Sequence, residues 1–406
     1  MNRKNKYSPK HLPQETQSEA YPGVREEAIQ EEPAEEPRAD VKHVEERRME
    51  EKKTKKKRRV PLAIWIVAAL MLLIICGSYF GVSYFYSRMN IQAPASEKES
   101  QIAVDDSWKE LISNEELGDI DKKLQENLES ESDWDYSAAN VTNILLIGVD
   151  NDYALGMNER GNADGIIIAS INKTTKQVVL TSLMRDIYVS VPGAYNTKLT
   201  LTYHYGGTQV LIDTIEANFG IPIDNYILVN YLNVIDIVDA VGGLTFDVSA
   251  DELFWMDEKI RNLNELLDLD GNANLIDPSQ AGTLLLNGVQ TAAYMRIRYA
   301  GNGDFDRTER TRNVLMGLKD KAMGMGVTEL VSFANVILPM ITTDLSQGKA
   351  IGLVMNAPTL LGYKMVSNRV PVDDSWYFAD LDGAVVIIDF PVNREFLSRS
   401  IYEGIA

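Results

Sequence analysis

The sequence predicts an α/β fold, in which a central mixed sheet carries helices on both faces, preceded by one transmembrane helix. Two observations predict it. From residue 143 onward, short apolar runs typical of buried strands alternate with segments whose apolar residues recur at helical spacing. Earlier in the chain, residues 61–86 carry no charge, and a helix of that length, at about 1.5 Å per residue, exceeds the ~30 Å hydrocarbon core of a membrane.

Composition divides the chain into four parts. Residues 1–59 are polar, rich in Glu, Pro, Lys and Arg and poor in aromatic residues, which predicts a disordered tail. We assign residues 60–87 to the transmembrane helix, 88–140 to an acidic stalk with a partly helical pattern, and 141–406 to the folded domain. A cleaved signal peptide is the alternative for the apolar run, but the run is too long and starts too late.

The charges on either side of the apolar run predict its orientation. The preceding segment, Lys52–Arg59, is strongly basic, and the following segment is acidic. Because basic flanks stay in the cytoplasm, we expect a single-pass cell-membrane protein with a cytoplasmic N-terminus and an extracytoplasmic C-terminal domain. This topology, together with contact to anionic membrane lipid, explains the basic run, so no nucleic-acid partner is predicted.

Cysteine and histidine usage argues against several kinds of chemistry. The only cysteine, Cys76, lies in the predicted span, which leaves the exported domain without a thiolate or a disulfide. His204 is the only histidine in the folded region, which argues against a catalytic triad and a histidine-based metal site. The stretch DLDGNAN (268–274) superficially matches a calcium loop but lacks its ligand spacing and closing glutamate.

The elements of the folded domain follow in order. Short apolar runs predict strands over 143–149, 165–171, 177–183, 225–229 and 244–248. Helical spacing predicts helices over 208–219, closed by Gly220, and over 231–241. We also expect two locally antiparallel pairs, 244–248 with 253–257 and 369–372 with 384–390, which would make the sheet a mixed one.

Arginines are concentrated between Tyr294 and Arg312. Five of them fall in this segment of a chain whose net charge is −19, so we expect an anionic ligand there. Arg296 and Arg298 alternate with apolar residues, which predicts a strand with both arginines on one face. A solvated charged turn is the alternative for the whole segment.

A helix is predicted to follow. Asp306 can cap it and Glu309 can close a capping box, and Arg307 and Arg310 would then share one face of its first turns. Cations at a helix N-terminus oppose the helix dipole, whereas backbone N–H groups there favour phosphate. These arginines therefore indicate a bound anion rather than a contribution to the helix.

Two carboxylates are candidates for a metal site. Asp150 ends one predicted strand and Asp164 precedes the next, and the loop between them is long enough to bring them together. Oxygen ligands of this kind suit Mg²⁺ shared with substrate phosphates, although a turn residue and a cap are the alternatives. Arg185 directly follows another strand, at the sheet edge where such folds bind ligands, and with the other arginines it would clamp a diphosphate.

The residues carry a resemblance to the LytR-CpsA-Psr family. Its motifs occur here in order as NILLIGVD, NADGIIIASIN, LTSLMRDIYVSVPG, KLTLTYHYGG, VNYLNVIDIVDAVGGLTFDV, LNGVQTAAYMRIR and DFDRTERTR. The resemblance implies an α-β-α sandwich with a long apolar pocket for a lipid tail. It also implies a membrane-anchored enzyme that moves an anionic glycopolymer from a polyprenyl pyrophosphate carrier to peptidoglycan.

The resemblance also implies roles for individual residues. It places Mg²⁺ on Asp150 and Asp164, and matches Asp304 to the aspartate before the final arginine pair. We assign pyrophosphate binding to Arg185, Lys198, Arg296, Arg298, Arg307, Arg310 and Thr311, and direct participation in catalysis to Asp164, Arg185 and Arg310. Two departures concern substrate choice or rate: Asn162-Ala163-Asp164 stands where the family typically has Arg-Ser-Asp, and Thr311 replaces a common glutamine.

The leading prediction is a Mg²⁺-dependent phosphotransferase whose glycopolymer is of the teichoic acid or capsule type. A carboxylate near the metal, Asp164 or Asp304, would help deprotonate the acceptor hydroxyl. Two alternatives remain open: a hydrolase that cleaves polyprenyl pyrophosphate with water, and a non-enzymatic membrane-bound regulator of envelope synthesis that signals through residues 1–59.

Overall fold

A computed structural model describes residues 81–92 except 82, residues 115–129, residues 140–150, and residues 161–405 except 195, 302 and 382. All of them belong to one compact unit, 69–406. The predicted tail, most of the predicted span and much of the predicted stalk lie outside this described part. Among the residues described, the structure contains no helix with the length and apolar character that a membrane crossing needs.

A seven-stranded mixed sheet forms the centre of the fold. Its strands lie in the order β1 (Asn90–Ile91), β10 (Thr342–Thr343), β7 (Asn225–Asn230), β2 (Val141–Val149), β3 (Ala163–Asn172), β4 (Gln177–Leu183) and β11 (Lys364–Val370). Strand β2 runs parallel to β7 and antiparallel to β3, and β4 runs parallel to β11. The predicted mixed sheet is therefore confirmed, and four of the five predicted strands belong to it as β2, β3, β4 and β7.

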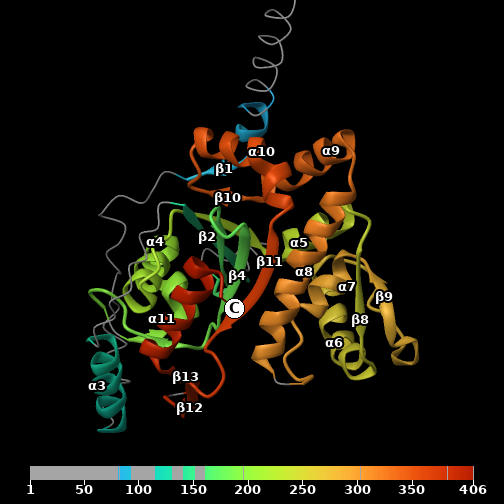
Figure 1. Cartoon of the computed structure of the whole chain (residues 1–406). Coiled ribbons are helices and arrows are strands. Elements are labelled where there is room, and N and C mark those ends of the chain that lie inside the picture. The colour runs from blue at the N-terminus through green and yellow to red at the C-terminus, as the bar shows by residue number, and fades with distance from the viewer. Residues whose placement is uncertain are drawn as a thin grey trace, which may run out of the picture. The chain divides into compact units, whose positions relative to one another are not determined.

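Helices cover both faces of the sheet (Figure 1). In this view α4 (Leu199–Phe219) and α11 (Phe390–Ser398) lie on one side, and α5 (Tyr231–Ala240), α7 (Gly288–Tyr294) and α8 (Asp304–Gly324) lie on the other. Gly220 caps α4 in the left-handed conformation, with φ of 74°, as the sequence predicts. The other α-helices in the described part of the chain are α3 (Glu115–Glu129), α6 (Ala250–Leu266), α9 (Val327–Ile337) and α10 (Gln347–Leu361).

Alternation along β2 separates the core from the site. Leu145, Ile147 and Val149 belong to the main hydrophobic core, which also includes Phe219 of α4 and Phe390 of α11. Leu146 and Gly148 are among the residues that line a pocket on the opposite face. Because successive side chains of a strand point to opposite faces, one strand thus supplies both the core and the pocket.

Two segments of the predicted stalk are part of the folded unit. Strand β1 adds to the sheet beside β10, and the Arg88 guanidinium donates to Asn335 of α9 at 2.9 Å. Helix α3 buries Ile120 and Leu124 in the main core.

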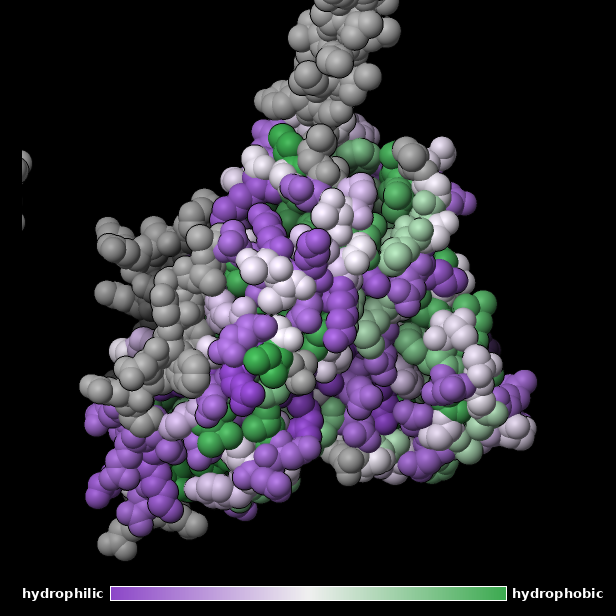
Figure 2. Space-filling model, viewed as in Figure 1, coloured by the Kyte–Doolittle hydropathy of each residue, from purple (hydrophilic) through white to green (hydrophobic). Residues whose placement is uncertain are grey.

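Figure 2 shows hydrophobic side chains gathered over α9, where Leu330, Val331 and Val336 are exposed.

The predicted strand over 294–299 is wrong. Helix α7 continues to Tyr294, residues 295–296 form a turn, and residues 297–300 are irregular. The capping box of Asn287 and Gln290 starts this helix. The buried residues that follow keep the chain helical up to Tyr294, where the alternation begins. The next helix begins at Asp304 with Gly303 as its N-cap, so the predicted cap at Asp306 is wrong by three residues.

Both predicted antiparallel pairs have different partners. Strand β8 (Leu244–Val248) pairs with β9 (Gly282–Leu286), and residues 253–257 belong to α6, which a capping box of Ser249 and Glu252 starts. Strand β13 (Ala384–Ile388) pairs antiparallel with β12 (Trp376–Asp380), whereas residues 364–370 form β11 and run parallel to β4. A strand distant in the sequence therefore pairs with β8, whereas β13 pairs with the strand directly before it in a short hairpin.

Candidate functional site

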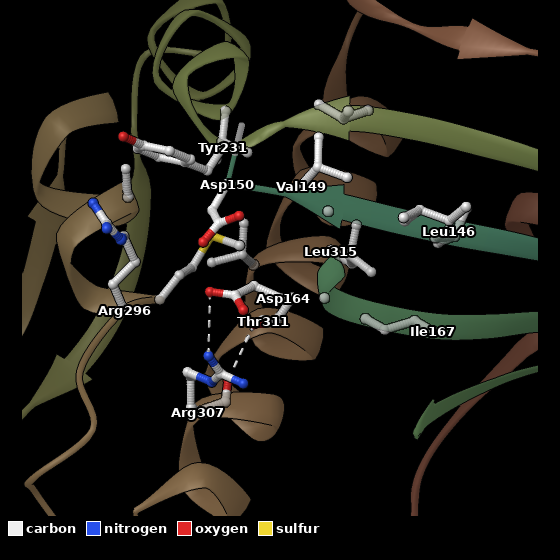
Figure 3. A pocket seen from close by; sticks show the side chains of 18 of the residues that line it. Leu146, Val149, Asp150, Asp164, Ile167, Tyr231, Arg296, Arg307, Thr311 and Leu315 are labelled. Carbon is white, nitrogen blue, oxygen red and sulfur yellow. Dashed lines mark hydrogen bonds and ion pairs between the residues drawn. The ribbon is translucent and has the colours of Figure 1, made fainter. Parts of the chain in front are cut away.

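A pocket of about 370 Å³ lies between the sheet and the helices α5, α7 and α8 (Figure 3). One part of its wall is apolar, and the other part carries carboxylates and arginines. The apolar wall includes Leu146, Ile167, Ile227, Val229, Val234, Ile237, Met295, Val314, Leu315 and Leu318. The polar part includes Asp150, Asp164, Arg296, Arg298, Arg307 and Thr311. Such a pocket suits a ligand with an anionic head and an apolar tail.

A break in the pairing of β2 and β3 presents Asp164 to the pocket. Gly148 pairs with Gly165 and Val149 pairs with Ala163, so Asp164 is an extra residue at a β-bulge. Bulges re-aim side chains and occur often next to active sites. A Cβ at Gly148 would lie 3.6 Å from the Gly165 Cα, so the two glycines keep the sheet surface beside the carboxylates free of side chains.

Three arginines converge on Asp164. Arg185 Nη1 donates to Asp164 Oδ1 at 2.5 Å. Arg298 Nη2 and Arg307 Nη1 lie 3.7 Å and 3.6 Å from Asp164 Oδ2. The three arginines come from the end of β4, the turn after α7 and the first turn of α8. Three of the arginines selected from the sequence as diphosphate ligands are therefore brought together at one carboxylate.

The charges of this cluster shift its pKa values. Burial raises the pKa of Asp164, but Arg307 and Arg185 outweigh it and hold that pKa below its usual value of 3.8. Burial lowers the pKa of Arg307, and Asp304 opposes this effect. Asp164 is therefore ionised at neutral pH and neutralises part of a site that would otherwise be strongly cationic.

Asp150 and Asp164 point toward the same space (Figure 3). Asp150 Oδ1 accepts a hydrogen bond of 2.5 Å from the backbone N–H of Asn162, which orients its carboxylate. Within the described ranges, no cluster of three or more His, Cys, Asp or Glu side chains is placed to hold a metal ion. Two carboxylates with space beside them fit Mg²⁺, which takes one or two carboxylates and completes its shell with water and substrate phosphate.

The other predicted pyrophosphate ligands of the pocket lie at its edge. The Arg296 guanidinium stacks 4.5 Å from the centre of the Tyr231 ring, which fixes the arginine beside the pocket. The Thr311 hydroxyl donates to the Arg307 carbonyl at 3.1 Å, one turn earlier in α8. Both residues line the pocket, as does Lys259 of α6.

Arg310 does not line the pocket. Its Nε donates to Glu252 at 2.9 Å, and its other nitrogens donate to the carbonyls of Ile297 and Ala300. The side chain is almost completely buried. Arg310 therefore holds the turn that carries Arg298, and its contact with Glu252 explains why a second arginine is buried on the face of α8 next to Arg307.

A second group of charges, Asp186, Lys198 and Asp304, lies next to the Asp164 cluster, and none of these three residues lines the pocket. Arg307 Nη2 pairs with Asp304 Oδ1 at 2.9 Å, and Arg185 Nε lies 3.9 Å from the same oxygen. Lys198 Nζ lies 3.9 Å from Asp186 Oδ1, and Arg185 Nε lies 3.5 Å from Asp186 Oδ2. Lys198 and Asp304 thus join the site through Arg185 and Arg307 rather than through the pocket itself.

Sequence reasoning missed most of the apolar wall, Lys259 and the ring of Tyr231. The signal was present in part, because α5 and α8 both carry apolar residues at helical spacing, but the same spacing is expected of an ordinary core helix. Only the packing of the helices shows that Val234, Ile237 and Leu315 border a pocket.

The family model "LytR_cpsA_psr family" matches residues 108–387, more than half of the chain. The chain is 31% identical over 236 residues to "Polyisoprenyl-teichoic acid--peptidoglycan teichoic acid transferase TagU" of Enterococcus faecalis, covering 56% of this chain and 71% of that one. It is also 31% identical over 233 residues to "Biofilm regulatory protein A" of Streptococcus mutans, covering 54% of this chain and 52%, about half, of that one.

Solved structures share the fold. "TagT bound to LI-WTA" superposes with a TM-score of 0.51 at 21% identity, covering 68% of this chain and 95% of that one. A protein of Streptococcus agalactiae superposes with a TM-score of 0.52 at 22% identity, covering 66% of this chain and 89% of that one. At these identities the likeness extends to the fold alone.

Proposed function

This chain belongs to the LytR-CpsA-Psr family, and from that premise we propose that it is a membrane-anchored, extracytoplasmic phosphotransferase. It attaches an anionic glycopolymer of the teichoic acid or capsule type, carried on polyprenyl pyrophosphate, to peptidoglycan. One observation carries the proposal: a single pocket joins an apolar wall to a cluster of arginines and two carboxylates. A relative named as a teichoic acid transferase supports the same reaction class.

The pocket divides the carrier between its two parts. The polyprenyl tail lies along the apolar wall, where burial of hydrocarbon contributes roughly 25 cal/mol per Å². The pyrophosphate lies against Arg298, Arg307 and Arg296, whose charge-assisted contacts contribute roughly 1.5–3 kcal/mol each. To make room for the phosphates, Asp164 yields part of its contact with Arg298 and Arg307, which it now holds at 3.7 Å and 3.6 Å.

Asp150 and Asp164 would hold Mg²⁺. When bound, the cation supplies positive charge against the pyrophosphate oxygens and orients the phosphorus under attack. The lowered pKa of Asp164, which the nearby arginines cause against the effect of burial, suits a metal ligand better than a general base. We therefore assign the role of proton acceptor to Asp304, which lies beside the cluster and outside the pocket.

The reaction is an in-line displacement. A peptidoglycan hydroxyl attacks the polymer-side phosphorus and gives its proton to Asp304. The bond from this phosphorus to the bridging oxygen breaks, and polyprenyl phosphate leaves with that oxygen. A phosphodiester then links the polymer to the wall. Arg185 and Arg307 neutralise charge on the equatorial oxygens as the bonds exchange.

The experiment uses the full chain in detergent with a polyprenyl pyrophosphate-linked glycopolymer and peptidoglycan. Wall-linked polymer should form with Mg²⁺, stop with a chelator, and be lost in Asp150→Asn, Asp164→Ala and Arg185→Ala. Full activity of Asp164→Ala or Arg185→Ala contradicts the assignment. Free polymer as the product would instead indicate the hydrolase.

A regulatory function is the second candidate, because one relative of similar identity is named a biofilm regulatory protein. Removal of residues 1–59 tests it. A transferase without this tail should keep its activity, whereas a protein that signals through the tail should lose its effect in the cell.

The membrane span and its orientation are part of the main proposal and are tested by protease protection of residues 1–59 in sealed vesicles.

A further inference from the structure

A partly exposed aromatic face borders the second group of charges: Phe378 is exposed, whereas Phe305 and Trp376 are partly buried against the main hydrophobic core. The rings of Phe305 and Trp376 lie 4.7 Å apart, and those of Trp376 and Phe378 lie 5.0 Å apart. Phe305 directly follows Asp304 in α8, and the other two rings lie on one side of β12 because they alternate with Tyr377. Phe378 is 61% exposed. We call these three residues the hairpin aromatic face.

The hairpin is attached firmly to the charged cluster. The backbone N–H of Val386 in β13 donates to the Asp186 carbonyl at 2.8 Å, and Ile187 forms a parallel β-bridge with Val386. At the turn of the hairpin, a Cβ on Gly383 would lie 3.7 Å from Lys198 Nζ. The hairpin therefore stands beside Arg185, Asp186 and Lys198 in a fixed position.

The geometry of the proposed reaction indicates what this face binds. In phosphoryl transfer the attacking and leaving oxygens lie roughly in line through the phosphorus. The leaving polyprenyl phosphate occupies the apolar pocket, so the acceptor hydroxyl must arrive from the other side of the phosphates. Asp304, Arg185 and Lys198 do not line the pocket, and the hairpin aromatic face continues outward from them.

The chemistry of the face suits a sugar ring. One side of a pyranose ring presents C–H groups with partial positive charge, and the face of an aromatic ring carries partial negative charge. The two stack while the hydroxyl groups at the rim of the sugar stay in water. The Arg369 guanidinium lies over the Phe305 ring, 4.5 Å from its centre, and donates to the Pro371 carbonyl and to Asp373, so the ring most open to stacking is that of Phe378.

We propose that the hairpin aromatic face binds the acceptor glycan strand of peptidoglycan and delivers its hydroxyl to Asp304. The inference rests on the proposed function. It commits to the acceptor rather than the donor glycopolymer, because in-line attack brings the acceptor from the side opposite the apolar pocket, where Asp304 and the hairpin aromatic face lie. The donor's sugar would instead lie on the pocket side of the phosphates. That side is bordered by Tyr299, which lines the pocket and whose ring lies 5.0 Å from that of Trp255.

The test compares Phe378→Ala with Tyr377→Ala in the full chain in detergent. Tyr377 is the matched control, since it is an exposed aromatic residue of the same strand on the opposite side. The probes are an uncrosslinked peptidoglycan oligomer and undecaprenyl pyrophosphate, and binding of each is measured by calorimetry. Phe378→Ala should weaken oligomer binding about tenfold and leave undecaprenyl pyrophosphate binding unchanged, and Tyr377→Ala should change neither.

Trp376 supplies a second pair of variants. Trp376→Phe keeps an aromatic ring and should retain oligomer affinity, whereas Trp376→Ala should lose it, with folding of each checked by thermal unfolding. Unchanged oligomer affinity in Phe378→Ala overturns the inference, and so does a loss confined to the carrier-linked glycopolymer or a change in oligomeric state on ultracentrifugation. Failure of the proposed function has a different signature, because the unaltered protein would then form no wall-linked polymer from the carrier-linked glycopolymer.

Discussion

Arg185 Nη1 and Asp164 Oδ1 form a hydrogen bond of 2.5 Å between the end of β4 and the bulge at the start of β3. The pair joins the candidate metal ligand to a candidate phosphate ligand. Asp164 thus performs two tasks, since its negative charge keeps the arginines together and its oxygens face the space that Asp150 also faces.

Asp164→Asn separates these two tasks. The amide keeps the shape of the side chain but removes the charge that competes with phosphate for Arg185 and Arg307. We expect undecaprenyl pyrophosphate to bind at least as tightly as to the unaltered protein, while Mg²⁺-dependent transfer falls by about hundredfold or more. Calorimetry measures the first quantity and wall-linked product measures the second. If Asp164→Asn transfers the polymer at the unaltered rate, Asp164 is not part of the site.

The pKa of Asp164 predicts how this charge depends on pH. Burial raises that pKa, but Arg307 and Arg185 outweigh burial, so it lies below 3.8 in the folded protein. The stabilisation by the ionised group is therefore complete above about pH 4 and is lost as the pH falls through the folded-state pKa. In metal-free buffer, the unfolding free energies of the unaltered protein and Asp164→Asn should differ by a constant amount at neutral pH. Denaturant titrations below about pH 4 should show the difference shrinking; a difference that grows there would contradict the sign.

Arg310 is expected to act on the fold. Its buried contact with Glu252 and with the carbonyls of Ile297 and Ala300 holds the turn beside the pocket. Glu252→Gln and Arg310→Ala should each lower the free energy of unfolding, by roughly 3–5 kcal/mol for the arginine. In a double-mutant cycle of the two, the losses should be non-additive. If Arg310 instead contacts pyrophosphate, the variant would lose ligand affinity with its unfolding unchanged.

Leu315→Trp should block part of the apolar wall. Leu315 faces the pocket from α8, and a larger side chain there shortens the space for hydrocarbon (Figure 3). We expect about tenfold weaker binding of undecaprenyl pyrophosphate and little change for geranyl pyrophosphate, whose tail is shorter. Leu330→Trp on the exposed surface of α9 is the control and should change neither. Equal losses for both lipids would place the tail elsewhere.

Much of the fold could be predicted from local pattern. The apolar runs from residue 143 to 248 became strands β2, β3, β4, β7 and β8 because each run is short, apolar and bounded by polar residues. Where prediction failed, a competing local signal or a distant partner decided the outcome. The alternation after Tyr294 suggested a strand, but α7 and the capping box that starts it extended into the segment.

The sequence by itself determined which chemistry is present: arginines gathered within one short segment, carboxylates beside strand ends, and an apolar run long enough to cross a membrane. Only the tertiary structure decided which partner each charged side chain contacts. Arg307 reaches Asp164 whereas Arg310, one turn later, reaches Glu252, and the β12–β13 hairpin stands beside Arg185. The physical reason is that these contacts join residues far apart in the chain, so their partners depend on how the sheet and helices pack and not on any local spacing.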